Sequence, residues 1–295
     1  MLLAPPTPFS IDRAFALATA AELAYSPGDQ ITTSVCDDWG FDDCRFIDSD
    51  DSQAFIAIDR DVLIVSFRGT EANFSDWLTD ADFSLVKGPL GGKVHEGFYD
   101  ALADIWHKMA AEIAYLDPQQ RKSLWVTGHS LGGALATLAA ARWIEARRTV
   151  QGLYTFGQPR TGDAAFRRNF NFALKASTFR FVNDNDLVTR VPPRALGFSH
   201  LGTMKYFTDA GRLESDASWW QLFLDRWTFH LDGFLDGELE ATQDHSMTGY
   251  RKLIEATRSP GSPNPFAPTQ PDARNVIPMF TPERKPVLLP RRRAA

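Results

Sequence analysis

One serine of the chain stands in a setting typical of nucleophilic catalysis. Ser130 is the centre of the run 128–132, Gly-His-Ser-Leu-Gly, which fits the pattern G-x-S-x-G. A β-branched stretch precedes it and an Ala-rich helical pattern follows, which predicts a tight strand-to-helix turn that presents the hydroxyl outward. The helix N-terminus behind the serine supplies N–H groups that an acyl-transfer oxyanion needs. Because about 0.1 such matches arise by chance in a chain of this length, the interpretation depends on the partners.

A serine hydroxyl needs a base within reach, and the base needs an acid that orients it. His245 stands in a polar segment that opens the last helical pattern, where a loop side chain can reach across a site. His129 adjoins the serine but is expected to point away around the tight turn, and His107 and His230 lie inside helical patterns. We therefore expect His245 to be the base.

Two acids qualify by spacing as the partner of that histidine. Asp184 and Asp186 both follow the predicted strand 178–182, and active sites of parallel sheets lie at the carboxyl ends of the strands. Spacing alone does not choose between them. The order serine, aspartate, histidine is the one expected where a G-x-S-x-G turn joins strand to helix.

The elements that must position these residues alternate along the chain. Strands are predicted at 54–58, 62–67, 123–127, 152–156 and 178–182, the first two as a hairpin. Helices are predicted at 11–25, with Ser10 as N-cap, and at 97–115, 131–148 and 163–173. This alternation predicts an α/β fold with a mostly parallel central sheet and helices on both faces.

Composition limits the class of protein. With 295 residues, 44% of them hydrophobic, the chain can bury a large core, and its net charge of −6 argues against a nucleic-acid partner. No apolar run approaches the ~20 residues of a membrane span. A change to Pro-rich sequence predicts one folded domain over 1–257 and a Pro/Arg-rich disordered tail over 258–295.

Location and redox state follow from the remaining features. The N-terminus shows no secretion-signal pattern, so a cytoplasmic protein is expected, with export by another route left open. Cys36 and Cys44 are close enough in sequence for a local disulfide, but free thiols are favoured in the cytoplasm. Neither cysteine stands in a metal-binding pattern, so no metal or cofactor is expected.

The chain resembles the fungal-type triacylglycerol lipases (class 3 lipases) and their bacterial relatives over about residues 10–255. The motifs that carry the resemblance follow one another in the family's order, at 65–70 (VSFRGT), 73–77 (NFSDW), 94–98 (VHEGF), 126–136 (VTGHSLGGALA), 154–162 (YTFGQPRTG), 181–188 (FVNDNDLV) and 244–247 (DHSM). The resemblance implies an α/β-hydrolase fold. It also implies that Asp186, which precedes the Leu-Val pair, is the acid and that His245 is the base. Thr70 and Leu131 match the residues of the oxyanion hole.

The resemblance further implies a lid over the site. Phe74, Trp77 and Leu78 share one face of a helical pattern over 71–85, as expected of a lid or substrate-binding helix, although a helix docked on the core would show the same pattern. A second aromatic stripe includes Trp220, Phe223 or Leu224, Trp227, Leu231 and Phe234; buried packing is its default interpretation and an acyl-groove wall the alternative. The segment from 196 to 240 is longer than in the fungal enzymes.

The resulting hypothesis is a carboxylic ester hydrolase, in the first place a lipase acting on acylglycerols through an acyl-enzyme. The alternatives are an esterase for phospholipid, monoacylglycerol or feruloyl esters, and a non-catalytic lipid-binding protein of the same fold. The expected partners are a lipid or other ester substrate and a transient lipid interface, without a transmembrane segment. The sequence leaves the oligomeric state open.

Overall fold

An eight-stranded sheet forms the centre of the protein in the computed structural model, which describes residues 7–49, 52–70, 83–184, 186–215, 244–262 and 264–266. β3, β6, β7, β9 and β11 run parallel, while β1, β2 and β12 are antiparallel to their neighbours. In spatial order the strands are β1 (Asp43–Asp48), β2 (Gln53–Ile58), β3 (Val62–Phe67), β6 (Ser123–His129), β7 (Gly152–Phe156), β9 (Thr178–Asn183), β11 (Thr203–Phe207) and β12 (Leu213–Ser215).

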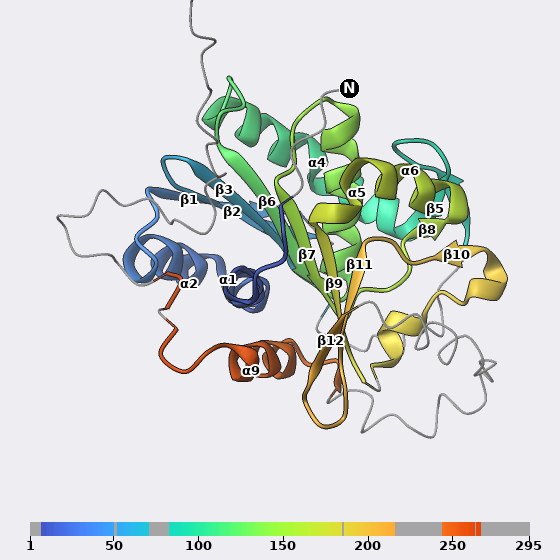
Figure 1. Ribbon diagram of the computed structural model, residues 1–295. Helices are drawn as coiled ribbons and strands as arrows, with labels where there is room; N and C mark the ends of the chain where they lie inside the picture. The colour runs from blue at the N-terminus through green and yellow to red at the C-terminus, as the bar shows by residue number, and fades with distance from the viewer. Residues whose placement is uncertain are drawn as a thin grey trace, which may run out of the picture.

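Helices cover both faces of this sheet (Figure 1). One face carries α1 (Ile11–Leu23) and α9 (Met247–Thr257), from opposite ends of the described chain. The other carries α4 (Glu96–Leu116), α5 (Leu131–Glu145) and α6 (Ala164–Leu174). The smaller elements are α2 (Gly28–Thr33), the π-helical η1 (Ser34–Asp38), the 3-10 turns η2 (Lys175–Ser177), η3 (Leu187–Arg190) and η4 (Arg194–Leu196), and a small second sheet of β10 (Phe198–Ser199), β8 (Gly162–Asp163), β5 (Lys93–His95) and β4 (Leu85–Lys87).

The two layers of helices bury two hydrophobic clusters, one on each side of the sheet. In β3, Leu63 and Val65 pack toward α4 and α5, whereas Val62 and Ile64 pack toward α1. Because a central strand is buried on both faces, its sequence is hydrophobic throughout rather than alternating. This is why 62–67 reads as an unbroken apolar run.

The α/β-hydrolase fold is confirmed, as are the elements on which it was predicted. The hairpin of β2 and β3 is present, and Ser10 caps α1 by accepting from the Arg13 N–H at 3.3 Å. β11 escaped prediction because a lysine interrupts its apolar pattern. Lys205 is nevertheless only 6% exposed, since its Nζ lies 4.1 Å from the centre of the Phe9 ring and 2.6 Å from Ser215 Oγ.

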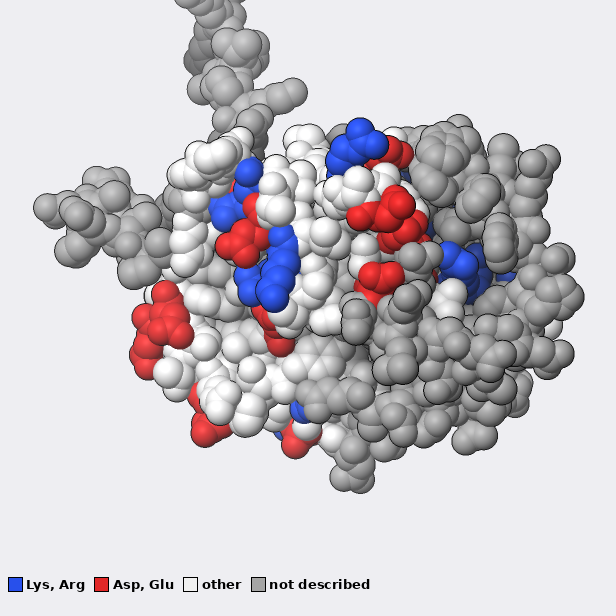
Figure 2. All heavy atoms as spheres, turned by 90° about the horizontal axis from the view of Figure 1, so that it is seen from below, with Lys and Arg blue, Asp and Glu red and all other residues white. Residues whose placement is uncertain are grey.

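Ion pairs join the two helices that lie on the same face. Arg251 of α9 pairs with Glu22 of α1, with Nε and Oε2 2.5 Å apart, and Arg258 pairs with Asp12, with Nε and Oδ1 2.7 Å apart. On the face seen from below, mixed groups of basic and acidic side chains stand beside groups of acidic side chains alone (Figure 2). The two ion pairs hold α9 to α1 in addition to the contacts of its apolar face. α9 begins two residues after the candidate base, His245.

Candidate active site

The turn that presents Ser130 is as tight as its sequence predicts. Ser130 has φ 56° and ψ −129°, a backbone conformation that residues other than glycine rarely adopt. It is the N-cap residue of α5. The glycines on either side allow β3, β6 and α5 to approach closely: a Cβ at Gly132 would lie 2.3 Å from the Phe67 carbonyl oxygen. Ser130 is 1% exposed, and its Oγ has no hydrogen-bond partner in the part of the chain that the structure describes.

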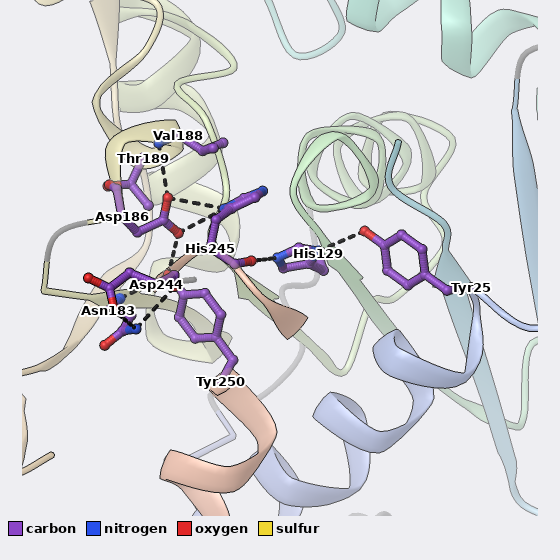
Figure 3. A network of polar contacts seen from close by, with 9 residues as sticks. All are labelled: Tyr25, His129, Asn183, Asp186, Val188, Thr189, Asp244, His245 and Tyr250. Atoms are coloured by element: carbon purple, nitrogen blue, oxygen red, sulfur yellow. Dashed lines mark hydrogen bonds and ion pairs between the residues drawn. The ribbon is translucent and has the colours of Figure 1, made fainter. Parts of the chain in front are cut away.

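His245 and Asp186 form a hydrogen-bonded pair (Figure 3). The Nδ1 of His245 lies 3.0 Å from Oδ2 and 3.1 Å from Oδ1 of Asp186. Asp186 is fully buried and is the N-cap of η3, which follows the end of β9, whereas His245 immediately precedes Ser246, the N-cap of α9. The imidazole is thus held at Nδ1, which leaves Nε2 as the nitrogen that can exchange a proton with a substrate or nucleophile.

Further donors hold the Asp186 carboxylate. The Val188 N–H donates to Oδ1 at 2.9 Å, and the Tyr250 hydroxyl donates to Oδ2 at 2.6 Å. Tyr250 in turn accepts from the Asn183 N–H at 2.9 Å. Burial first, and the Asp186 charge second, raise the pKa of Tyr250 well above its usual value, so this hydroxyl stays protonated and remains a donor. Nothing in the spacing pattern of the sequence pointed to Tyr250 or Asn183.

Asp184, the other acid that spacing allowed, is engaged elsewhere. It accepts a hydrogen bond from the hydroxyl of Tyr206 in β11. Burial first, and the hydrogen bond with Asp184 second, raise the pKa of Tyr206, so the tyrosine remains a donor to the carboxylate. The structure therefore pairs His245 with Asp186, as the family resemblance implied.

Ser130 and the His245–Asp186 pair lie at the same edge of the sheet. The Ser130 N–H donates to the Phe156 carbonyl at 3.0 Å. The next residue, Gly157, has φ +56°, and a Cβ there would lie 2.8 Å from Asp186 Oδ2 and 2.9 Å from His245 Nδ1. The end of β7 and the glycine after it thus contact the nucleophile's backbone, the acid and the base. The requirement for glycine at 157 could not be recognised without the contacts.

His129 points away from the nucleophile, as expected, but it contacts the base. Its Nε2 lies 2.6 Å from the carbonyl oxygen of His245, and its Nδ1 lies 2.7 Å from the hydroxyl of Tyr25 (Figure 3). Burial first, and the neighbouring His245 second, lower the pKa of His129 well below its usual value. His129 is therefore neutral in the folded protein at neutral pH.

Thr70 and Leu131 are the residues that the family resemblance assigned to the oxyanion hole. Leu131 is the first residue of α5, so its N–H is not required by the helix ladder. Thr70 is exposed and follows Gly69, where a Cβ would lie 3.2 Å from that of Ser130. Leu131 thus follows the serine directly, and the residue before Thr70 approaches it closely. Phe74, Trp77, Leu78 and the aromatic stripe of 220–234 lie outside the described residues.

The described residues include no group of three or more His, Cys, Asp or Glu that could bind a metal ion. Cys36 and Cys44 are free thiols, and burial is the main cause that raises the pKa of each. Among the helices that the structure describes, none has the length and apolar character needed to cross a membrane.

A comparison with known protein families gives a match for the central region of the chain. Residues 64–196 match the family model for lipase (class 3). This class 3 lipase region includes Ser130 and Asp186 and ends before His245. The family resemblance of the motifs is confirmed for this region.

Curated relatives match about half of the chain. A lipase of Rhizomucor miehei is 36% identical over 156 residues, which cover 50% of this chain and 42% of that protein. A secreted mono- and diacylglycerol lipase of Fusarium solani is 36% identical over 172 residues, covering 55% of this chain and 49% of that protein. The chain therefore spans slightly less than half the length of these relatives.

Solved structures agree in fold. The triacylglyceride lipase of Rhizomucor miehei superimposes with a TM-score of 0.59 at 26% identity, covering 75% of this chain and 92% of that one. A triacylglycerol lipase whose catalytic centre is described as a serine protease triad superimposes with a TM-score of 0.57, also at 26% identity and with the same coverage. These structures bear out the α/β-hydrolase architecture of the class 3 lipase region.

The expectation of a cytoplasmic protein is wrong on this comparison. The relatives from Fusarium solani and Malassezia restricta are named as secreted lipases. The expectation had depended on the N-terminal residues alone.

Proposed function

We propose that the protein is a serine carboxylic ester hydrolase that acts on acylglycerols. The observation that carries this proposal is the His245–Asp186 pair beside the strained turn of Ser130, at the carboxyl ends of β6, β7 and β9. An orienting carboxylate, an imidazole and a hydroxyl at a helix N-terminus are the groups that acyl transfer requires.

In the proposed reaction, Ser130 Oγ attacks the ester carbonyl carbon while Nε2 of His245 takes the hydroxyl proton. Asp186 stabilises the imidazolium that forms and holds its orientation. The N–H groups of Thr70 and Leu131, with the Thr70 hydroxyl, bind the oxyanion. The alcohol leaves with the proton from His245, and water then attacks the acyl-enzyme by the same steps, releasing the acid. No metal or cofactor takes part.

The acylglycerol substrate is supported by the relatives, whose names specify mono- and diacylglycerol or triacylglyceride lipases. By the family resemblance, Phe74, Trp77 and Leu78 belong to a lid that opens at a lipid interface. We extend secretion from the named relatives to this chain, while the affiliation with bacterial members of the family stays a prediction. The other candidates are an esterase for other esters and a lipid-binding protein without activity.

Replacing the nucleophile tests the reaction class. Ser130→Ala should reduce turnover of a soluble p-nitrophenyl ester by several orders of magnitude and abolish labelling by a fluorophosphonate, with the melting temperature retained. Ser34→Ala, in η1 outside the site, is the matched control and should label like the wild type. Wild-type labelling of Ser130→Ala, or no labelling of the wild type, would refute the proposed function.

Acyl-chain length separates the lipase from the esterase. A lipase should hydrolyse long-chain triacylglycerols faster when their concentration exceeds the solubility limit, because the lid then opens at the interface. A preference for short, dissolved esters on both sides of that limit would assign the chain to the esterases.

A further inference from the structure

We propose that Tyr25 and His129 form a positioning pair that fixes the main chain of His245 relative to Ser130. The inference rests on the proposed function, since it assigns a role within the same site. His129 is not a catalytic residue here: it acts through the carbonyl of the base.

The first argument is connectivity. His129 is covalently bonded to Ser130, and its Nε2 lies 2.6 Å from the main-chain oxygen of His245. A single hydrogen bond therefore links the nucleophile's own backbone to the base's own backbone. Asp186 holds the imidazole of His245 at Nδ1 but does not set the distance from that ring to Ser130. The contact from His129 supplies this second restraint.

The second argument concerns the proton on His129. A carbonyl oxygen only accepts, so Nε2 of His129 must carry the hydrogen of that bond. A neutral imidazole then has its lone pair on Nδ1, which lies 2.7 Å from the Tyr25 hydroxyl. Tyr25 donates to this lone pair and thereby selects the one tautomer that can hold the His245 carbonyl. In the other tautomer the lone pair of His129 Nε2 would face a lone pair of the His245 carbonyl oxygen.

The third argument is the need for a neutral ring at this place. The centres of the His129 and His245 rings are only 4.5 Å apart. A positive charge on His129 would repel the imidazolium that forms on His245 during acyl transfer. The low pKa of the buried His129 removes that conflict. The donor for Nδ1 is a neutral hydroxyl, which adds no charge.

The fourth argument is the space reserved for the tyrosine. A Cβ at Gly69 would lie 2.2 Å from the Tyr25 hydroxyl oxygen and 2.7 Å from the His129 carbonyl oxygen. Any side chain at position 69 would therefore displace the hydroxyl from Nδ1. The glycine that precedes Thr70 is thus required by the positioning pair as well as by the nucleophile's turn.

Tyr25→Phe is the central variant, because it removes one oxygen and keeps the ring that packs beside His129 and Arg68. Active sites are counted with a fluorophosphonate, and kcat and KM are measured per titrated site on p-nitrophenyl butyrate. We expect kcat to fall about 10-fold, since misplacement by about 1 Å costs up to 100-fold, with KM within twofold of the wild type. Tyr154→Phe removes a hydroxyl in the same buried cluster and should match the wild type.

Variants of His129 supply the rescue. His129→Gln keeps an N–H donor at the reach of Nε2, so it should retain more of kcat than His129→Leu, which has no donor. Because glutamine has no tautomer to select, adding Tyr25→Phe to His129→Gln should cost less than it costs in the wild type. This non-additivity is the signature of two residues that act as a unit.

A structural role alone would lower the number of titrated sites and leave kcat per site unchanged. The positioning pair is refuted if Tyr25→Phe retains kcat per site within twofold, or if the two substitutions are additive. In the wild type, the 15N spectrum should show His129 protonated only at Nε2, and a mixture or the Nδ1–H form would also refute it. Inactivity of the wild type toward the fluorophosphonate would instead refute the proposed function.

Discussion

At the scale of single residues, the site depends on backbone conformations that side chains normally avoid. Ser130 and Gly157 both have φ of 56°, one as the candidate nucleophile and the other against the His245–Asp186 pair. Ser130 adopts this strained conformation although it has a side chain, and the proposed reaction needs that side chain. Gly157 must lack a side chain, because the acid and the base fill the space that a side chain would occupy.

Gly157→Ala should therefore sharply lower the proposed ester hydrolysis, whereas Gly197→Ala should not. Both glycines have positive φ, so both substitutions cost about 1–2 kcal/mol of stability. Only at 157 would the new methyl group approach the acid and the base within 3 Å, whereas nothing lies within 4 Å at 197. We expect kcat to fall about 100-fold for Gly157→Ala alone. Equal kcat values for the two variants would contradict this explanation.

The cysteines should differ in reactivity. Burial is the main cause that raises the pKa of the Cys44 thiol to about 12. Since only the thiolate reacts, about 10⁻⁴ of Cys44 is reactive at pH 8 in the folded protein. Cys36 is more exposed, so iodoacetamide should modify Cys36 first and Cys44 only at higher pH or after unfolding. Mass spectrometry of the native protein at pH 8 measures both rates, and equal rates would contradict the prediction.

At the scale of elements, the close approach of β3, β6 and α5 determines where the nucleophile stands. α5 begins directly after Ser130, and its first turn touches the end of β3 through Gly132. The position of the whole helix is therefore coupled to the geometry of the turn.

Gly132→Ala tests this coupling. A Cβ there would lie 2.3 Å from the Phe67 carbonyl oxygen, so the helix must shift, at a cost of about 1–3 kcal/mol in the free energy of unfolding. Gly97→Ala in α4 meets only a side chain, at 3.3 Å, and should be within about 1 kcal/mol of the wild type. Denaturant unfolding of both variants, with kcat as a second measurement, decides the matter; equal stabilities would contradict it.

At the scale of the whole molecule, the two ends of the described chain close on each other. Arg258 pairs with Asp12, and Phe266 is 2% exposed and stacks on Trp39 with ring centres 4.0 Å apart. Both contacts lie beyond the predicted domain boundary at 257, which remains a prediction. They support a folded unit that extends to about residue 266.

Two truncations locate the boundary. Ending the chain after 257 removes the Arg258 ion pair and the Phe266 ring, whose burial contributes about 1.5–3 kcal/mol. We expect this chain to melt about 3–10 °C lower than the wild type. A chain that ends after 266 should melt within about 1 °C of the wild type. If the two truncated chains have the same melting temperature, the contacts beyond 257 do not contribute.

The sequence by itself determined the fold class, the parallel strands β3, β6, β7 and β9 and the serine turn, because these are local patterns. Apolar periodicity identifies buried strands, and a G-x-S-x-G run needs only its two flanking elements. It could not choose between Asp184 and Asp186, because spacing allowed both, and the choice came from resemblance. Nor could it find β11, where the buried Lys205 breaks the pattern. Only the tertiary structure showed that Tyr25, His129, Gly157 and Tyr250 belong to the site. Each acts through a contact with a residue distant in sequence, and chain folding alone brings such residues together.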